Sequence, residues 1–249
     1  MIIGVIPARG GSKGIRKKNI KEIAGKPLLV WTIEAAGKSK LLDDVVVSTD
    51  SEEIAQVAKE NHCAVIMRSP EFATDTSPII DTIKDVLDKT PIRVDTVVLL
   101  QPTSPIRSPH LIDLCIKTYQ NLDVDSVATG FECKFKSYGT NLQQRQEYEG
   151  FGYDDGSVYV INSDIIRQGK LFTDKLKVIQ TSREENVEID DEFDFWLAEQ
   201  ILKKKNYKKG INVGKMCKEK GCTHRAQCKG YCTGCYNNKW KEKNGKNRR

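Results

Sequence analysis

The sequence predicts an α/β fold in which helices cover both faces of a mainly parallel β-sheet, giving three layers. Short apolar runs rich in β-branched residues, such as IIGVIP at 2–7 and DTVVLL at 95–100, have the length and composition of buried strands. Segments of helical length separate these runs, and this β-loop-α alternation favours parallel strands. After the pattern ends, five cysteines crowd into 19 residues, which indicates a small Cys-rich C-terminal module.

The expected elements follow one another in a regular order. We expect strands at 2–7, 45–48, 64–67, 95–100, 125–129 and 158–161. We expect helices at 28–37, from Asp50 or Ser51 onward, and at 79–87, 109–119 and 191–204. Glu52 and Glu53 would lie in the first turn of the second helix, where negative charge is favourable. Residues 131–154 are polar, aromatic and charged, and they interrupt the alternation.

Charge divides the chain at the same place as the cysteines. Residues 203–249 carry 16 Lys or Arg and 2 Asp or Glu, a net charge of +14. Residues 1–202 carry 24 basic and 32 acidic residues, a net charge of −8. We therefore expect an α/β domain at 1–205, a basic linker at 206–215 and a Cys-rich module at 216–249.

The sequence predicts neither a membrane protein nor an exported one. Its apolar runs are shorter than the roughly 18 residues that a membrane span needs. The apolar start, MIIGVIPARGG, is too short for a signal peptide and lacks a basic first region and a cleavage-site pattern. We expect a cytoplasmic protein, and in that compartment clustered cysteines favour a metal site over disulfides.

The loop after the first strand combines glycines with basic residues. Residues 8–19 read ARGGSKGIRKKN. Glycines let backbone amides approach an anion closely, while Arg and Lys supply charge for phosphates. Neither GxxxxGK[ST] nor GxGxxG is present, so the pattern predicts a phosphate-binding loop of another kind. A solvated basic turn is the alternative interpretation of the same composition.

The order of residues in this loop resembles a known family signature. IPARGGSKGIRKKN, which starts at the end of the first strand, resembles that of the acylneuraminate cytidylyltransferases, which include CMP-N-acetylneuraminic acid synthetases and other nonulosonic acid cytidylyltransferases. Further segments match in the same order: STDSEEIA at 48–55, RSPEFATDTSP at 68–78, LLQPTSPIR at 99–107, RQ at 145–146, DDGSVYV at 154–160 and EIDDEFDFWLAEQ at 188–200. The resemblance covers roughly residues 1–202.

The resemblance implies a Rossmann-like nucleotide-diphosphosugar transferase fold and a nucleotidyltransferase activity. The expected reaction couples CTP to an acidic nine-carbon sugar of the sialic acid type and gives a CMP-sugar and pyrophosphate. It needs no protein nucleophile, because the sugar 2-hydroxyl attacks the α-phosphate and pyrophosphate leaves. Family members are usually dimers, so a homodimer is expected, with residues 131–154 as a short projecting arm.

The resemblance also assigns roles to residues around CTP. Arg9, Lys13 and Lys18 are the expected catalytic residues, because cations directed at the β- and γ-phosphates stabilise the leaving pyrophosphate. The other expected nucleotide-binding residues are Ala8, Gly10, Gly11, Ser12, Asn19, Arg68 and Ser77. Arg68 and Ser77 match positions near the cytosine and ribose. Ser77 has an alternative role as a helix cap before Pro78.

Four residues match positions that face the acceptor sugar in the family. They are Gln101, Arg145, Asp155 and Tyr159. Arg145 matches an arginine that binds the sugar carboxylate, and its alternative is a solvated charge. Asp155 departs from the family, which usually has asparagine there, and this puts the usual acceptor contacts in doubt.

Two acidic residues before the last expected helix match the family's Mg²⁺ ligands. The family pattern is Asp-x-Asp, so Glu188 and Asp190 are the candidates, and Glu188 departs from it by one methylene. Carboxylates two apart on an extended segment can face one side and hold Mg²⁺ against a phosphate. Asp194 more naturally stabilises the start of the helix.

The cysteine-rich tail predicts a structural Zn²⁺ site. Cys217, Cys222, Cys232 and Cys235 form two pairs with metal-ligand spacing, and Cys228 and His224 are spare ligands. The segment also resembles small zinc-binding modules found beside DNA-related domains. The alternatives are a disordered basic tail with incidental thiols, or a disulfide framework in an exported protein.

Two other functions compete with the sialic-type cytidylyltransferase. One is a cytidylyltransferase for another acidic sugar such as Kdo, although QPTSP differs from the acidic loop of that branch. The other is a zinc-containing nucleic-acid-binding protein with an inactive transferase domain, since the tail's charge and aromatic residues suit phosphates and bases. The intact basic loop and the EIDD segment favour the enzyme.

Overall fold

The structure is a computed structural model that describes residues 1–74, 76–134, 144 and 149–212. Internal contacts divide the chain into two compact units, Met1–Glu199 and Gln200–Arg249. The first unit carries the α/β fold. The expected arm residue Arg145 and the cysteines Cys217, Cys222, Cys228, Cys232 and Cys235 lie outside the described residues.

Within the described residues, seven strands form one mainly parallel sheet. They are β1 (Ile2–Pro7), β4 (Asp44–Thr49), β5 (Ala64–Met67), β6 (Thr96–Leu99), β7 (Ser126–Cys133), β8 (Phe151–Asn162) and β9 (Leu176–Gln180). Their order across the sheet is β5-β4-β1-β6-β8-β7-β9. β8 runs antiparallel to β6 and β7, and the other neighbouring strands pair in parallel.

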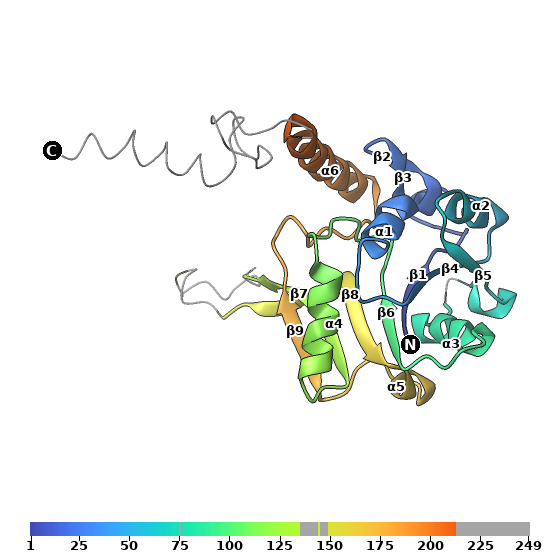
Figure 1. The fold of residues 1–249 in the computed structure, drawn as a ribbon. Coiled ribbons are helices and arrows are strands. Elements are labelled where there is room, and N and C mark those ends of the chain that lie inside the picture. Colours follow the sequence, from blue (N-terminus) through green and yellow to red (C-terminus); the bar gives the residue numbers. More distant parts are fainter. Residues whose placement is uncertain (75, 135–143, 145–148, 213–249) are drawn as a thin grey trace, which may run out of the picture. The chain divides into compact units, whose positions relative to one another are not determined.

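Helices pack on both faces of this sheet, as Figure 1 shows. One face packs against α1 (Leu28–Ala36), α2 (Glu52–Glu60) and α4 (Leu111–Asn121), and the other against α3 (Ile79–Lys89) and α5 (Ser163–Arg167). Consecutive strand residues face opposite layers, so Val97 packs in the α3 core and Val98 in the α1 core. Both valines are fully buried, which explains why β6 is a continuous apolar run. The predicted three-layer α/β fold is confirmed.

The loops that leave the carboxyl ends of the parallel strands gather at one edge of the sheet. Residues 8–17 follow β1 and lead into the 3₁₀ helix η1 (Lys18–Ile20) and the small ribbon of β2 (Glu22–Ile23) and β3 (Lys26–Pro27). The loop after β5 contains the 3₁₀ helix η2 (Pro70–Phe72), and residues 100–107 follow β6. Ligands in open α/β sheets bind at this edge.

Several elements differ from the sequence prediction. β7 and β8 extend beyond the expected strands to Cys133 and back to Phe151, into the region expected to interrupt the alternation. β9 and α5 were not expected. The last helix, α6 (Glu192–Asn212), extends beyond its expected end at 204 and includes residues 206–212 of the expected linker.

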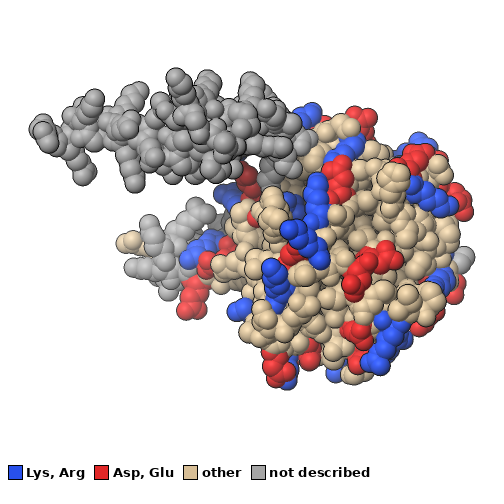
Figure 2. Space-filling view, in the orientation of Figure 1, with Lys and Arg blue, Asp and Glu red and all other residues tan. Residues whose placement is uncertain are grey.

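The surface of the described residues carries charges of both signs. Figure 2 shows Lys and Arg interspersed with Asp and Glu over the visible face. Ion pairs such as Lys21–Glu192 and Lys26–Glu34 contribute to this pattern. Among the helices that the structure describes, none is long and apolar enough to span a bilayer.

Candidate active site

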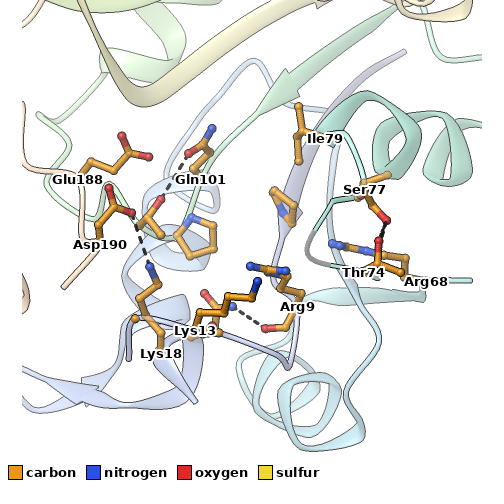
Figure 3. A pocket seen from close by; sticks show the side chains of 17 residues that line it. Arg9, Lys13, Lys18, Arg68, Thr74, Ser77, Ile79, Gln101, Glu188 and Asp190 are labelled. Atoms are coloured by element: carbon orange, nitrogen blue, oxygen red, sulfur yellow. Dashed lines mark hydrogen bonds and ion pairs between the residues drawn. The ribbon is translucent and has the colours of Figure 1, made fainter. Parts of the chain in front are cut away.

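A polar cavity of about 490 Å³ opens at the carboxyl edge of the parallel strands. The side chains in Figure 3 lie in an order along it. Gln101, Glu188, Asp190 and Lys18 lie at one end, Arg68 and Ser77 lie at the other, and Arg9 and Lys13 lie between them. The lining residues are Pro7, Arg9, Ser12, Lys13, Gly14, Lys18, Asn19, Arg68, Thr74, Ser77, Ile79, Thr82, Gln101, Pro102, Thr103, Glu188 and Asp190.

The basic loop is fixed to the protein at several points. Ala8 continues the β1 pairing by donating its N–H to the Ser48 carbonyl at 2.9 Å, and Ile15 is buried at 2% exposure. The Asn19 amide donates to the Arg9 carbonyl at 2.9 Å and closes the loop. At Gly14 the loop lies so close to the 188–190 segment that an added Cβ would be 2.2 Å from the Asp190 carbonyl oxygen. A loop anchored in this way holds its charges in place before a ligand arrives.

Three cations of the loop line the cavity. They are Arg9, Lys13 and Lys18. Lys18 donates its Nζ hydrogen to the Ile189 carbonyl at 2.6 Å and lies 4.0 Å from the Asp190 carboxylate. Burial lowers the pKa of Lys18, and the carboxylates of Asp190 and Glu188 oppose that shift. The cluster can bind a polyanion such as a triphosphate.

The far end of the cavity is shaped by the loop after β5. Arg68 is 8% exposed, and its guanidinium donates to the Ser48 carbonyl at 3.0 Å and the Phe72 carbonyl at 3.4 Å. Burial lowers the Arg68 pKa. Arg68 therefore fixes the loop that forms this end of the cavity, in addition to lining it.

Ser77 does not cap the following helix. Its hydroxyl donates to the Glu71 carbonyl at 3.1 Å and accepts the Thr74 N–H at 3.2 Å. Pro78 is the N-cap of α3, without a side-chain capping bond. The alternative interpretation of Ser77 as a cap is therefore wrong, and Ser77 instead stabilises the 71–77 loop.

Glu188 and Asp190 lie at the end of the cavity that holds Gln101 (Figure 3). Burial raises the pKa of Glu188, and the nearby charges of Asp190 and Asp154 raise it further. A cation bound beside Glu188 would stabilise its ionised form and offset this effect. Two carboxylates completed by phosphate oxygens are a usual Mg²⁺ donor set, so the residues fit the predicted ion. Among the described residues, no group of three or more His, Cys, Asp or Glu is arranged for a metal.

Several expected site residues do not line the cavity. Ala8 is fully buried, and the Gly10 amide donates to the Asp50 carboxylate at 2.8 Å instead of facing the cavity. Gly11 also lies outside the lining. Asp155 is fully buried, and Tyr159 is 5% exposed and donates its hydroxyl hydrogen to Asp154 at 2.6 Å. The structure therefore contradicts direct contact of Asp155 with a cavity ligand, because its carboxylate is enclosed by protein donors.

Other lining residues were not singled out from the sequence. They are Pro7, Gly14, Thr74, Ile79, Thr82, Pro102 and Thr103. Thr74 and Pro102 lie inside segments that matched the family signature, so that signal could have found them. Thr82 lies on the first turns of α3, and its place at the cavity depends on how that helix packs against the sheet.

Comparisons with known proteins identify the family of this chain. A family model described as Cytidylyltransferase matches residues 3–210. An N-acylneuraminate cytidylyltransferase of Streptococcus agalactiae serotype III (strain NEM316) is 33% identical over 212 residues, covering 78% of this chain and 51% of the relative. A CMP-N,N'-diacetyllegionaminic acid synthase of Legionella pneumophila is 33% identical over 222 residues, covering 81% of this chain and 96% of the relative.

The chain spans about half the length of the Streptococcus relative and nearly the whole of the Legionella one. Among solved structures, a CMP:2-keto-3-deoxy-manno-octonic acid synthetase complexed with CTP has a TM-score of 0.67 at 13% identity. The match covers 82% of this chain and 99% of that one. At this identity the likeness shows the fold.

Proposed function

The chain belongs to the cytidylyltransferase family, and from this premise we propose that it transfers CMP from CTP to a nonulosonic, sialic-type acid and releases pyrophosphate. The observation that carries the proposal is the order of groups along one cavity. Gln101, two carboxylates and Lys18 lie at one end, the Arg68–Ser77 loop lies at the other, and Arg9 and Lys13 lie between them. Such a cavity suits a nucleoside triphosphate whose phosphates lie beside an acceptor.

The basic loop would act on the triphosphate. Arg9, Lys13 and Lys18 line the cavity on a loop whose geometry is already fixed. Preorganised cations stabilise charge that develops on the leaving pyrophosphate without reorganising during the reaction. Ser12 and Asn19 line the same part and would add contacts to the nucleotide.

The acceptor would bind at the end of the cavity where Gln101, Glu188 and Asp190 lie. Glu188 and Asp190 would hold Mg²⁺ together with substrate oxygens, and the chemistry supplied there is neutralisation of phosphate charge. Arg145 is proposed as the partner of the sugar carboxylate, since a guanidinium fork suits that group. The attacking hydroxyl would lie on the sugar, so no protein nucleophile is required.

Release of pyrophosphate tests this function directly. Purified full-length protein is incubated with CTP and Mg²⁺ and with sialic, pseudaminic, legionaminic or Kdo acid in turn, and replacing CTP by ATP or UTP is the nucleotide control. We expect CTP-dependent release with at least one nonulosonic acid. Release with Kdo alone would identify the alternative acceptor. Silence with every acid, from protein that melts cooperatively, would refute the enzyme proposal.

The proposal extends to the tail and to the assembly. We propose that Cys217, Cys222, Cys232 and Cys235 bind one structural Zn²⁺, so metal analysis should find about one zinc per chain. We also propose a homodimer, which light scattering of the eluted protein would measure. Salt-sensitive DNA binding without pyrophosphate release would instead favour the zinc-containing nucleic-acid-binding protein.

A further inference from the structure

Strand β8 bulges where it passes Gln101 and Glu188. Ala128 of β7 pairs with Tyr159 of β8, whereas Gly130, two residues on, pairs with Asp154. Two steps along β7 thus correspond to five along β8, and residues 155–158 form a bulge. Bulges re-aim side chains and are common next to active sites, so the contacts that hold this one decide the shape of the site beside it.

A buried carboxylate holds the bulge from one side. Asp155 accepts hydrogen bonds from the hydroxyls of Thr129 and Thr181 and from the Ser157 N–H at 3.0 Å. The Thr129 hydroxyl also accepts the Val158 N–H at 3.0 Å. The Asp155 charge is therefore enclosed by donors of three segments, β7, the bulge and the residue after β9.

A guanidinium holds the bulge from the other side. Arg107 donates to the Ser157 carbonyl through Nε at 3.1 Å and Nη2 at 2.9 Å. It also donates to the Gln101 carbonyl at 2.7 Å and to the Thr32 hydroxyl at 2.9 Å. All these acceptors are neutral oxygens. Burial lowers the pKa of Arg107 to about 10, and the nearby charge of Asp155 opposes that shift.

The two charges share one residue of the bulge. Ser157 gives its N–H to Asp155 and its carbonyl to Arg107, so its backbone dipoles lie between a negative and a positive group. We propose that Arg107 and Asp155 form a pair of positioning residues that fixes the acceptor end of the cavity. Asparagine at 155 would leave the guanidinium without this counter-charge, and an uncompensated buried charge is costly. The buried Asp155 carboxylate supplies that counter-charge and is enclosed by protein donors.

The bulge touches the residues that form the acceptor end. Gly156 has φ +64°, and an added Cβ would lie 3.1 Å from Oε1 of Gln101 and 3.2 Å from Oε1 of Glu188. Arg107 meanwhile holds the Gln101 backbone. A shift of the bulge would therefore move both side chains, and displacements near 1 Å can cost about a hundredfold in rate.

Four variants test the pair, together with a matched control. Asp155→Asn and Arg107→Met each remove one charge, the double variant removes both, and Arg107→Lys keeps the charge but not the fork. Ser163→Ala is the control, because it removes a buried hydrogen bond to the Val94 carbonyl from the first residue of α5, directly after β8. The kinetic part of the test rests on the proposed function. Hydrogen exchange of peptides spanning 154–160 does not.

We expect each single variant to raise the acceptor KM by about tenfold or more while the CTP KM stays within about twofold. The backbone amides of 155–158 should exchange faster in each single variant. The acceptor KM of the double variant should not exceed that of the more affected single variant. Arg107→Lys should raise the acceptor KM less than Arg107→Met does. Ser163→Ala should lower Tm without changing the acceptor KM.

Additive effects in the double variant, or equal rises in both KM values, would overturn the proposal. If Arg107→Met does not fold, Asp155→Asn and Arg107→Lys carry the same comparison. If the wild type turns over no acid, the proposed function fails, while the exchange and Tm data on the four variants still decide whether the pair fixes the bulge.

Discussion

Substitution of Gly14 by alanine should move the basic loop (residues 8–19) without removing any of its charged or polar groups, so it tests whether the position of the loop matters for activity. The new Cβ would lie 2.2 Å from the Asp190 carbonyl oxygen, whereas contacts of this kind under 3.0 Å are essentially never observed. The loop and the 188–190 segment must therefore move apart by at least 0.8 Å. The Gly14 backbone conformation is open to alanine, since its φ is not in the left-handed region, so the effect is steric.

Such a displacement moves the basic loop relative to Glu188 and Asp190. A shift near 1 Å can cost about a hundredfold in rate, which corresponds to roughly 2.7 kcal/mol of activation free energy. We expect kcat/KM for CTP, measured by pyrophosphate release, to fall by about that factor. No charged or polar group is removed by the change, so the loss would be one of position.

Gly152→Ala is the matched control, because an added Cβ there meets nothing within 4 Å. It should leave kcat/KM nearly unchanged. Thermal unfolding followed by circular dichroism checks that both variants are folded. If Gly14→Ala retains the activity of Gly152→Ala, the close approach of the loop to Asp190 does not matter for turnover and the reasoning fails.

Three further changes test charges of the site. Lys13→Ala should lower kcat by about a hundredfold. Lys17→Ala is the control, because it removes only an exposed ion pair with Glu53, and it should leave kcat nearly unchanged. Equal losses of kcat in the two variants would refute the role of Lys13. Glu188 has a raised pKa, so its ionisation destabilises the fold as pH rises above the unfolded value near 4.5, and Glu188→Gln should raise Tm at neutral pH but not below that value. Glu185 has a lowered pKa through hydrogen bonds from Ser108 and Ser182, so it stabilises the fold above about pH 4.5. Glu185→Gln should lower Tm at neutral pH, with the difference shrinking as pH falls through the folded pKa; a constant difference would contradict the assignment.

The parts of the fold that sequence predicts well are those whose pattern is local. β1, β4 and β6 are buried on both faces, so their apolar runs are continuous and their limits are clear. β9 was missed because its side chains are mostly exposed and its pairing with β7 lies far along the chain. The extension of β7 and β8 was missed for a similar reason, since polar and aromatic residues carry it.

The same distinction holds for the site. Residues of the basic loop were found because contiguous residues carry the signal. The contact of Gly14 with Asp190 joins positions 176 residues apart in the chain, and its closeness depends on the packing of two loops. Such a contact leaves no periodic pattern in the sequence.

The two departures from the family pattern have different physical consequences. Glu188 faces the cavity, where the extra methylene changes the reach of a carboxylate whose pKa is already raised by burial. Asp155 lies behind the cavity, where its carboxylate accepts three hydrogen bonds. The positive charge of Arg107 lies on the other side of Ser157 and is opposite in sign to that of Asp155. A substitution at Glu188 should therefore act on metal and substrate directly, whereas one at Asp155 should act through the bulge. Comparing the Mg²⁺ dependence of Glu188→Asp with that of Asp155→Asn distinguishes them: the first should shift the Mg²⁺ concentration for half-maximal rate, and the second should leave it in place while raising the acceptor KM.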